Sequence, residues 1–336
     1  MSTSEPRSKQ SNWQFDLDQI RRILILRMGP LGETLLTTPV IRALRGRFPE
    51  AHIAYMVAPG REDLVSENPN LDEVITYSVS IPKLIYNMAK RSFDMVVILQ
   101  PTFRLVMHTF LARIPFRIGF ETNTGKGRLL HAAVPNNIDQ HEIARYLDVV
   151  RGVGIEPDSH EPEMFVSPAA QRWVDDFLDG AGVSSDRPLI GLNPGSGSES
   201  RRWSKEGFAQ VGDRLHHKYN AQILITAGDA EGALPHDVAD LMSCSPIILT
   251  GITPMQLGAM LQKCRLYISN DTGPMHMSTA VKTPTIALFG ASNAQQWGPH
   301  WQPHTIIARE SMAEITVEDV LEATDLSLSR LGLKAQ

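Results

Sequence analysis

Three loops of the chain carry residue types that could do chemistry, and the first of them contains a carboxylate. This loop has the sequence MGPLGET over residues 28–34, and Glu33 falls at the start of a helical pattern. A carboxylate in that position can complement the helix dipole and cap free amides. If it lies at the end of a buried strand and faces a cleft, it can instead take a proton from a substrate hydroxyl. The sequence leaves both interpretations of Glu33 open.

The second loop is polar and basic, with the sequence NPGSGSESRRW over residues 193–203. Its glycines and serines let backbone amides and hydroxyls approach an anion closely. Arg201 and Arg202 can add charged hydrogen bonds of the kind that suit phosphate oxygens. A flexible surface loop with two solvated arginines is the alternative. We take a diphosphate-binding site as the hypothesis for this loop.

The third loop, SNDTGPMH over residues 269–276, follows an apolar segment and precedes a helical pattern. Asp271 or Thr272 can cap this helix and Pro274 suits its first turn, which accounts for half of the motif without a ligand. The same helix N-terminus would direct backbone amides and a positive dipole toward an anion. Two such loops in one half of the chain together predict that this half binds phosphate groups.

The overall composition disfavours several classes of protein. The 336 residues carry 32 Lys and Arg against 37 Asp and Glu, a net charge of -5, so no global basic field is available to hold a nucleic-acid backbone. Cys244 and Cys264 form no Cys-x-x-Cys pattern, which indicates neither a disulfide framework nor a zinc cluster. The polar N-terminus lacks a signal-peptide core, and no run of about 18 apolar residues is present. These features predict a cytoplasmic protein that does not cross a membrane.

Short apolar segments alternate with helical patterns along most of the chain, which predicts an α/β fold with two doubly wound parallel sheets. The expected strands are 22–27, 52–57, 73–77, 94–99 and 117–120 in the first half and 189–193, 222–226, 246–249, 266–269 and 285–289 in the second. The expected helices include 34–47, 205–218, 230–242, 254–263 and 275–281. A linker is predicted at Glu161-Pro162-Glu163, and a ligand cleft between the domains.

A nicotinamide-dependent oxidoreductase is a further class of protein that an α/β fold can serve. Its Gly-x-Gly-x-x-Gly fingerprint is absent after the first expected strand, where the chain has Gly29, Pro30, Leu31 and Gly32. This alternative therefore depends on fold analogy alone.

In this order, the three loops resemble those of the ADP-heptose:lipopolysaccharide heptosyltransferases of glycosyltransferase family 9. The resemblance extends from about Arg22 to Leu331 and is carried by RILILRMGPLGETLLTTPVIRALRGRFPEAHI, IPFRIGF, NPGSGSESRRWSKEGFAQV and, most specifically, SNDTGPMHMSTAVKTPTIALFG. It implies a GT-B fold, in which two Rossmann-like domains with parallel sheets face one another across a cleft. The implied divisions are a polar extension (1–20), an acceptor-binding domain (21–165), a nucleotide-sugar-binding domain (166–314) and a C-terminal helix (315–336) that packs back on the first domain.

The resemblance also implies roles for individual residues. Glu33 matches the family's proposed general base, which is generally an Asp, and Arg201 matches a basic residue that holds the donor phosphates. The implied donor-binding residues are Ser196, Gly197, Arg201, Glu231, Asp271, Thr272, Gly273 and His276. The implied reaction is an inverting transfer of a heptose or related sugar from ADP-heptose to the lipopolysaccharide inner core, without a metal or other cofactor. The alternative is a non-catalytic or regulatory relative that binds a sugar nucleotide and uses Glu33 only as a cap.

Basic residues of the first half are interspersed with apolar ones and form the candidate acceptor-binding set. They are Lys83, Lys90, Arg91, Arg104, Arg113 and Arg117. A basic patch suits an acceptor rich in phosphate and carboxylate groups, and it predicts peripheral contact with the cytoplasmic face of the inner membrane. Ordinary amphipathic helices with solvated outer charges are the alternative for each segment. Nucleic acid is not expected as a partner.

Overall fold

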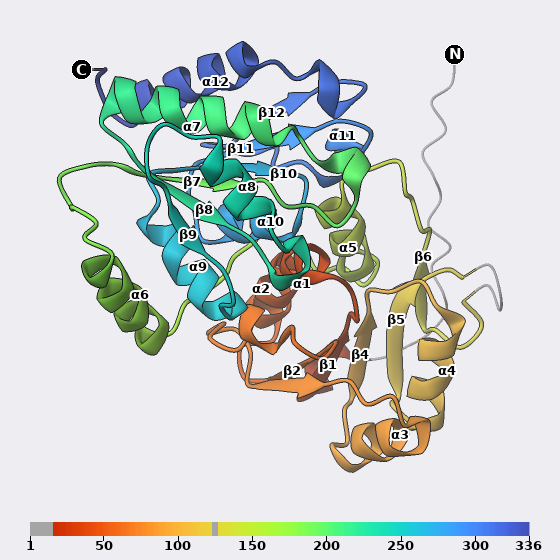
Figure 1. The fold of residues 1–336 in the computed structure, drawn as a ribbon. Helices are drawn as coiled ribbons and strands as arrows, with labels where there is room; N and C mark the ends of the chain where they lie inside the picture. Colours follow the sequence, from red (N-terminus) through yellow and green to blue (C-terminus); the bar gives the residue numbers. More distant parts are fainter. Residues whose placement is uncertain (1–15, 123–126, 336) are drawn as a thin grey trace, which may run out of the picture.

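Each half of the chain folds around a six-stranded parallel sheet (Figure 1). The computed structural model describes residues 16–122 and 127–335, so most of the extension predicted over 1–20 lies outside the described residues. The strands of the first sheet are arranged in the order β3-β2-β1-β4-β5-β6. Their bounds are β1 Arg22–Leu26, β2 His52–Val57, β3 Glu73–Thr76, β4 Met95–Ile98, β5 Phe116–Phe120 and β6 Ala132–Val134.

The second sheet repeats this arrangement in the order β12-β11-β10-β7-β8-β9. Its strands are β7 Leu189–Asn193, β8 Gln222–Thr226, β9 Ile247–Leu249, β10 Leu266–Asn270, β11 Thr285–Phe289 and β12 Thr305–Ala308. Numbered along each domain, both sheets have the order 3-2-1-4-5-6 of doubly wound nucleotide-binding folds. All the paired strands run parallel within the described residues. The predicted pair of doubly wound α/β domains is confirmed.

Helices cover both faces of each sheet. Those of the first domain are α1 Leu31–Leu36, α2 Thr38–Arg47, α3 Ile81–Lys90, α4 Phe103–Leu111 and α5 Glu142–Arg151. Those of the second are α6 Pro168–Gly180, α7 Lys205–Tyr219, α8 Leu234–Asp240, α9 Pro254–Lys263, α10 Gly273–Ala280, α11 Ala294–Trp297 and α12 Val317–Arg330. On β1, Ile23 and Ile25 belong to one core, whereas Leu24 and Leu26 belong to another. Because successive side chains of a strand point to opposite faces, both faces of β1 must be apolar.

Two strands and one helix differ from the sequence-based prediction. The sixth strand of each sheet, β6 or β12, is short and largely half-buried, so it lacks the continuous apolar run that marks the inner strands. The helix predicted over 34–47 is two helices that meet at Thr37, whose hydroxyl hydrogen-bonds the Thr34 carbonyl and the Tyr55 hydroxyl at 2.7 Å each. Pro39, in the first turn of α2, has no amide with which to continue the helical ladder.

The two domains meet where α1 lies against α10 (Figure 1). Leu31 packs on Gly273, where an added Cβ would come within 3.0 Å of the Leu31 Cβ. Gly32 contacts the His276 ring, and a side chain at position 32 would overlap that ring. The two glycines therefore allow the loop after β1 in one domain to approach the loop after β10 in the other.

The predicted linker is attached to both domains. Glu163 pairs with Arg42 of α2 at 2.6 Å, and its amide donates to the Thr38 hydroxyl at 2.9 Å. Glu161 pairs with Lys282, which follows α10, at 2.8 Å. The connection between the domains is therefore anchored on each side.

The C-terminal helix α12 packs on the second domain, and the expectation that it returns to the first domain is wrong. It lies against α7, β11 and β12 (Figure 1). Val320 and Leu328 are fully buried in the core of the second domain. Asp325 accepts hydrogen bonds from Lys218 and Tyr219 of α7 at 2.6 and 2.7 Å. The apolar face of α12 is covered by these contacts within its own domain.

Candidate active site

The three loops singled out from the sequence lie where the strand order of each sheet reverses. The first loop follows β1, which lies between β2 and β4, and the other two follow the neighbouring strands β7 and β10. Ligands of open α/β sheets bind beyond the carboxyl ends of the strands at such a point. The contact of α1 with α10 brings the first loop to the other two. The predicted cleft between the domains is therefore the candidate site.

A pocket of about 320 Å³ lies among these loops. Four of the predicted donor-binding residues line it, namely Gly197, Glu231, Thr272 and Gly273. Its apolar lining includes Leu249, Ile252, Pro254, Leu257 and Met277 of the second domain. Leu31 of the first domain is also part of the lining. Polar groups beside an apolar wall suit a ligand that carries both phosphates and a flat base.

Arg201 is paired with Asp271 beside this pocket. The distance from Arg201 Nη1 to Asp271 Oδ2 is 3.5 Å, and the two side chains are 38% and 6% exposed. A Cβ placed on Gly197 would lie 3.8 Å from Arg201 Nη2, which puts the guanidinium next to a pocket-lining residue. The long ion pair and the exposure of Arg201 leave its guanidinium able to bind a second anion.

Arg202 has a different role from its neighbour, because it holds the loop together. Its Nη2 donates to the Ser196 carbonyl at 3.1 Å. From the adjacent loop, Asn270 Nδ2 donates to the carbonyls of Pro194 and Gly195 at 2.9 and 3.2 Å. The Ser196 residue is itself buried. The first part of the segment, 193–196, is therefore buried and hydrogen-bonded in the pocket wall, whereas Gly197, Glu199 and Ser200 are exposed.

His276 is buried at the contact between the domains. Its ring lies against Gly32. Burial lowers the pKa of His276 to about 4, against the opposing effect of the Asp271 carboxylate. The imidazole is therefore uncharged at neutral pH, so it does not act as a cation toward phosphate. The structure places His276 as the packing partner of the loop that carries Glu33.

Glu33 is paired with Arg27 rather than with the amides of α1. Its carboxylate accepts a hydrogen bond from Arg27 Nη2, while the N-cap position of α1 is Pro30, which makes no side-chain cap. The side chains of Arg27 and Glu33 are 8% and 20% exposed. The Glu33 side chain is therefore paired with a buried cation and partly exposed to solvent, which leaves it accessible to a substrate.

The six basic residues of the candidate acceptor set lie at opposite edges of the first sheet. In a doubly wound domain, the helix begins near the carboxyl end of the strand before it. Lys83 and Arg104, in the first turns of α3 and α4, therefore lie at the edge that carries Glu33. The other four, near the end of α3 or the start of β5, lie at the amino edge: Lys90, Arg91, Arg113 and Arg117. The structure does not gather the six into one site.

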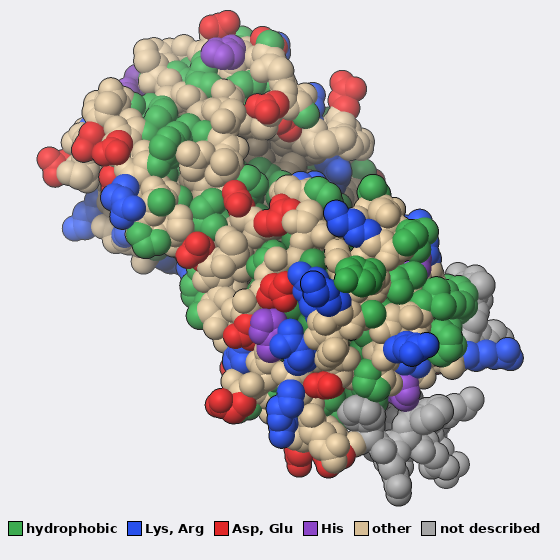
Figure 2. All heavy atoms as spheres, turned by 90° about the horizontal axis from the view of Figure 1, so that it is seen from below, with side chains coloured by type: hydrophobic (Ala, Val, Ile, Leu, Met, Phe, Trp, Pro, Cys, Tyr) green, Lys and Arg blue, Asp and Glu red, His purple; other side chains and the backbone are tan. Residues whose placement is uncertain are grey.

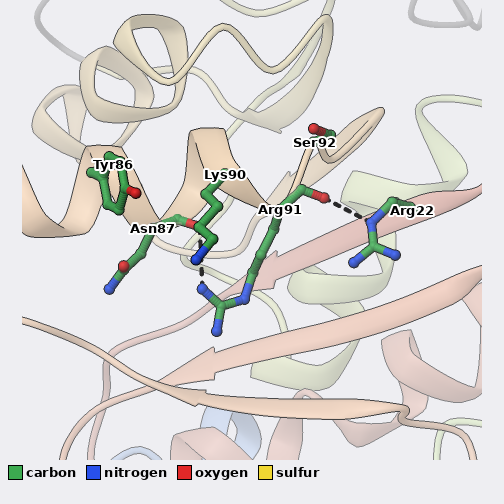
Figure 3. A pocket seen from close by; sticks show the side chains of 6 residues that line it. All are labelled: Arg22, Tyr86, Asn87, Lys90, Arg91 and Ser92. Atoms are coloured by element: carbon green, nitrogen blue, oxygen red, sulfur yellow. Dashed lines mark hydrogen bonds between the residues drawn. The ribbon is translucent and has the colours of Figure 1, made fainter.

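An open hollow of about 650 Å³ at this amino edge is lined by Arg22, Tyr86, Asn87, Lys90, Arg91 and Ser92 (Figure 3). Arg91 is engaged within the domain, because its guanidinium pairs with Glu73 at 2.7 Å and its carbonyl accepts from Arg22 Nε at 2.7 Å. Arg117 is also engaged within the domain, because its Nε donates to the Leu129 carbonyl at 2.7 Å. Arg91 and Arg117 therefore stabilise the first domain.

Two basic residues at the carboxyl edge of the first sheet have no distinguishing motif in the sequence. Arg27 directly follows β1, and Arg61 lies shortly after β2. The Arg61 Nε atom is buried and has no hydrogen-bond partner in the part of the chain that the structure describes. Their position at, or shortly after, the end of an apolar segment is the sequence feature that could have placed Arg27 and Arg61 at this edge.

Neither a metal cluster nor a membrane span is found in residues 16–122 and 127–335. No three His, Cys, Asp or Glu side chains of these ranges are placed together to hold a metal ion. No helix of these ranges is both long and apolar enough to cross a bilayer.

Two doubly wound domains that meet at the carboxyl edges of their sheets define the GT-B class of fold. Solved structures show the same fold. The glycosyltransferase family 9 protein from Veillonella parvula is 23% identical, with a TM-score of 0.85 over 92% of this chain and 97% of that one. The E. coli ADP-heptose LPS heptosyltransferase II is 21% identical, with a TM-score of 0.81 over 93% of this chain and 100% of that one.

This chain belongs to glycosyltransferase family 9 (heptosyltransferase), whose family model matches residues 81–323. The lipopolysaccharide core heptosyltransferase OpsX of Haemophilus influenzae is 22% identical over 83% of this chain and 82% of its own length. The family and the enzyme class predicted from the three loops, a glycosyltransferase rather than an oxidoreductase, are confirmed.

Proposed function

We propose that this protein transfers a heptose from ADP-heptose to a hydroxyl of the lipopolysaccharide inner core. The observation that carries the proposal is the first turn of α1. Leu31 lines the pocket, and Glu33, two residues further on, holds a partly exposed carboxylate. Transfer to a hydroxyl requires a base, and the short helix that contributes Leu31 to the pocket also carries this carboxylate. The similar proteins OpsX and heptosyltransferase II are named for a lipopolysaccharide core acceptor and an ADP-heptose donor, respectively, which supports both substrates.

In the proposed reaction, Glu33 removes the proton of the acceptor hydroxyl while the hydroxyl oxygen attacks the anomeric carbon. The bond from that carbon to the diphosphate oxygen breaks on the opposite face, so the configuration inverts and the electron pair leaves with ADP. Arg201 and the amides at the start of α10 stabilise the charge that develops on the diphosphate. Because these groups supply the positive charge, we propose that the transfer needs no metal ion.

The donor pocket is expected to prefer ADP over other nucleotides. We place the base against the apolar lining of the pocket and the ribose near Glu231, whose side chain lies over Gly195, where an added Cβ would be 2.7 Å from Glu231 Cγ. Isothermal calorimetry with ADP, UDP, GDP and NAD should show the tightest binding for ADP. Tighter binding of UDP, GDP or NAD than of ADP would contradict the proposal that the donor carries ADP.

We also propose that the first domain rests on an anionic bilayer through α3, α4 and the residues that flank them. Residues 74–120 contain six Lys and Arg, of which Arg91 and Arg117 are engaged within the domain, but one acidic residue, Asp94. Asp94 is used internally, where it accepts from the amides of Arg21 and Arg22 at 2.8 Å. Large apolar side chains are exposed in the same region, namely Val79, Ile81, Tyr86, Phe110 and Leu111. Basic and apolar side chains lie side by side on this domain (Figure 2).

Charge reversal on α3 is expected to weaken binding to anionic vesicles. Lys83→Glu combined with Lys90→Glu should reduce the partition coefficient on phosphatidylglycerol vesicles at least about tenfold, since each cation near an anionic surface contributes about 1 kcal/mol. Arg172→Glu combined with Lys334→Glu, two exposed cations elsewhere, is the matched control. Equal vesicle binding by the two double variants in a flotation assay would rule out this membrane-facing surface.

A further inference from the structure

Arg27 is a buried cation at the carboxyl end of β1. Its side chain is 8% exposed, its guanidinium carbon lies 5.5 Å from the centre of the Tyr146 ring, and its Nε has no hydrogen-bond partner among the described residues. Burial raises the pKa of the Tyr146 hydroxyl, so this ring is neutral and offers only its face to the cation. The ion pair described for Arg27 is with Glu33. The carboxylate of Glu33 therefore balances the charge of Arg27.

Gly29 leaves the space in which this pair forms. A Cβ at position 29 would overlap Glu33 Oε2 and lie 3.2 Å from Glu33 Cβ and 3.3 Å from Arg27 Cζ. An added Cβ at Gly46 of α2, by contrast, would have nothing within 4 Å. Position 29 therefore needs a residue without a side chain, so that the side chains of Arg27 and Glu33 can meet there.

The charged groups of α5 and of the segment 271–276 are already neutralised. On α5, Glu142 and Arg145 pair with each other, with Arg145 Nε 3.0 Å from Glu142 Oε1. In the loop after β10, Asp271 pairs with Arg201, and on α10 His276 is neutral because burial lowers its pKa. Beside the helical turn 62–64, which packs on α1, Arg61 donates to the Gly60 carbonyl at 3.2 Å and Glu62 accepts from the Thr76 hydroxyl at 2.7 Å. Arg27 acts most directly on the carboxylate of Glu33, because its guanidinium donates a hydrogen bond to it.

We infer that Arg27 is the positioning residue for Glu33, and that Gly29 is the residue that permits it. The guanidinium donates a hydrogen bond to the carboxylate and fixes its direction. The longer side chain of Glu, compared with Asp, lets the carboxylate reach from the first turn of α1 back to the end of β1. This inference rests on the proposed function, in which Glu33 is the base for the acceptor hydroxyl.

The pH dependence of turnover separates positioning from a merely structural role. Removing the cation in Arg27→Met should destabilise the ionised carboxylate and raise the pKa of Glu33, so the acid limb of the kcat profile should move to higher pH. The plateau should fall about tenfold because the carboxylate is no longer aimed. Arg27→Lys keeps the charge and should retain the wild-type acid limb. ADP affinity, measured by calorimetry, should be unchanged in both variants.

The glycine pair supplies an independent test. Gly29→Ala should lower kcat with little change in ADP affinity, whereas Gly46→Ala should leave both at wild-type values. An unshifted acid limb in Arg27→Met, or equal kcat in the two glycine variants, would overturn the positioning role while the base assignment stands. Full turnover by Glu33→Gln would overturn the base assignment and this inference together.

Discussion

Replacing Glu33 by Gln is expected to lower the turnover number by about 10²- to 10⁴-fold, the usual contribution of a general base. Gln has nearly the same size but cannot take the proton of the acceptor hydroxyl. Its amide oxygen can still accept the hydrogen bond from Arg27 Nη2, so the buried guanidinium keeps a partner. Turnover should be measured as ADP release in the presence of both donor and acceptor.

Folding and donor binding are the controls for Glu33→Gln. The dissociation constant for ADP should stay near the wild-type value, because the donor pocket is lined mainly by the second domain. The thermal midpoint should fall, because Glu33→Gln leaves the charge of the buried Arg27 unbalanced, so turnover is compared well below the midpoint of the variant. Glu33→Asp should be slower than the wild type and faster than Gln, since it keeps the carboxylate but loses reach toward Arg27. If Glu33→Gln turns over as fast as the wild type, Glu33 is structural and the base lies elsewhere.

Removing the Arg201 guanidinium is expected to weaken ADP binding by about 10- to 150-fold. This range corresponds to the 1.5–3 kcal/mol of a hydrogen bond to a charged group. The turnover number should fall as well, because Arg201 also stabilises the leaving diphosphate in the proposed reaction. Calorimetry with ADP on Arg201→Ala measures the first effect, and a saturating-donor assay measures the second.

Two further variants define the chemistry at position 201. Arg201→Lys keeps the charge with a different donor geometry and should recover part of the ADP affinity. Arg172→Ala, on α6, removes an exposed arginine away from the pocket and should leave ADP affinity unchanged. An unchanged dissociation constant in Arg201→Ala would remove Arg201 from the donor site.

The sheets and the three loops could be predicted because each depends on local features of the sequence. Inner strands such as β1 and β7 are buried along nearly their whole length, so they are continuous apolar runs. Their loops contain glycines where another residue approaches closely, as the His276 ring does at Gly32. The edge strands β6 and β12 have weaker patterns because solvent reaches them.

The remaining differences arise from tertiary contacts. The apolar face of α12 could pack on either domain, and its hydrogen bonds to α7 through Asp325 are not visible in its own periodicity. Lys83 and Lys90 lie on one helix but near opposite edges of the sheet. The pairing of Arg27 with Glu33 requires the turn at Gly29 to fold the two side chains together, and residue spacing alone does not predict that turn.

The product of the reaction tests the central claim most directly. The protein should be incubated with ADP-heptose and an inner-core acceptor that lacks heptose, and the acceptor analysed by mass spectrometry together with the released ADP. We expect one heptose to be added for each ADP released, and this transfer to be largely lost with Glu33→Gln. Binding of ADP-heptose without a glycosylated acceptor would contradict the account and assign the protein to the non-catalytic sugar-nucleotide-binding alternative.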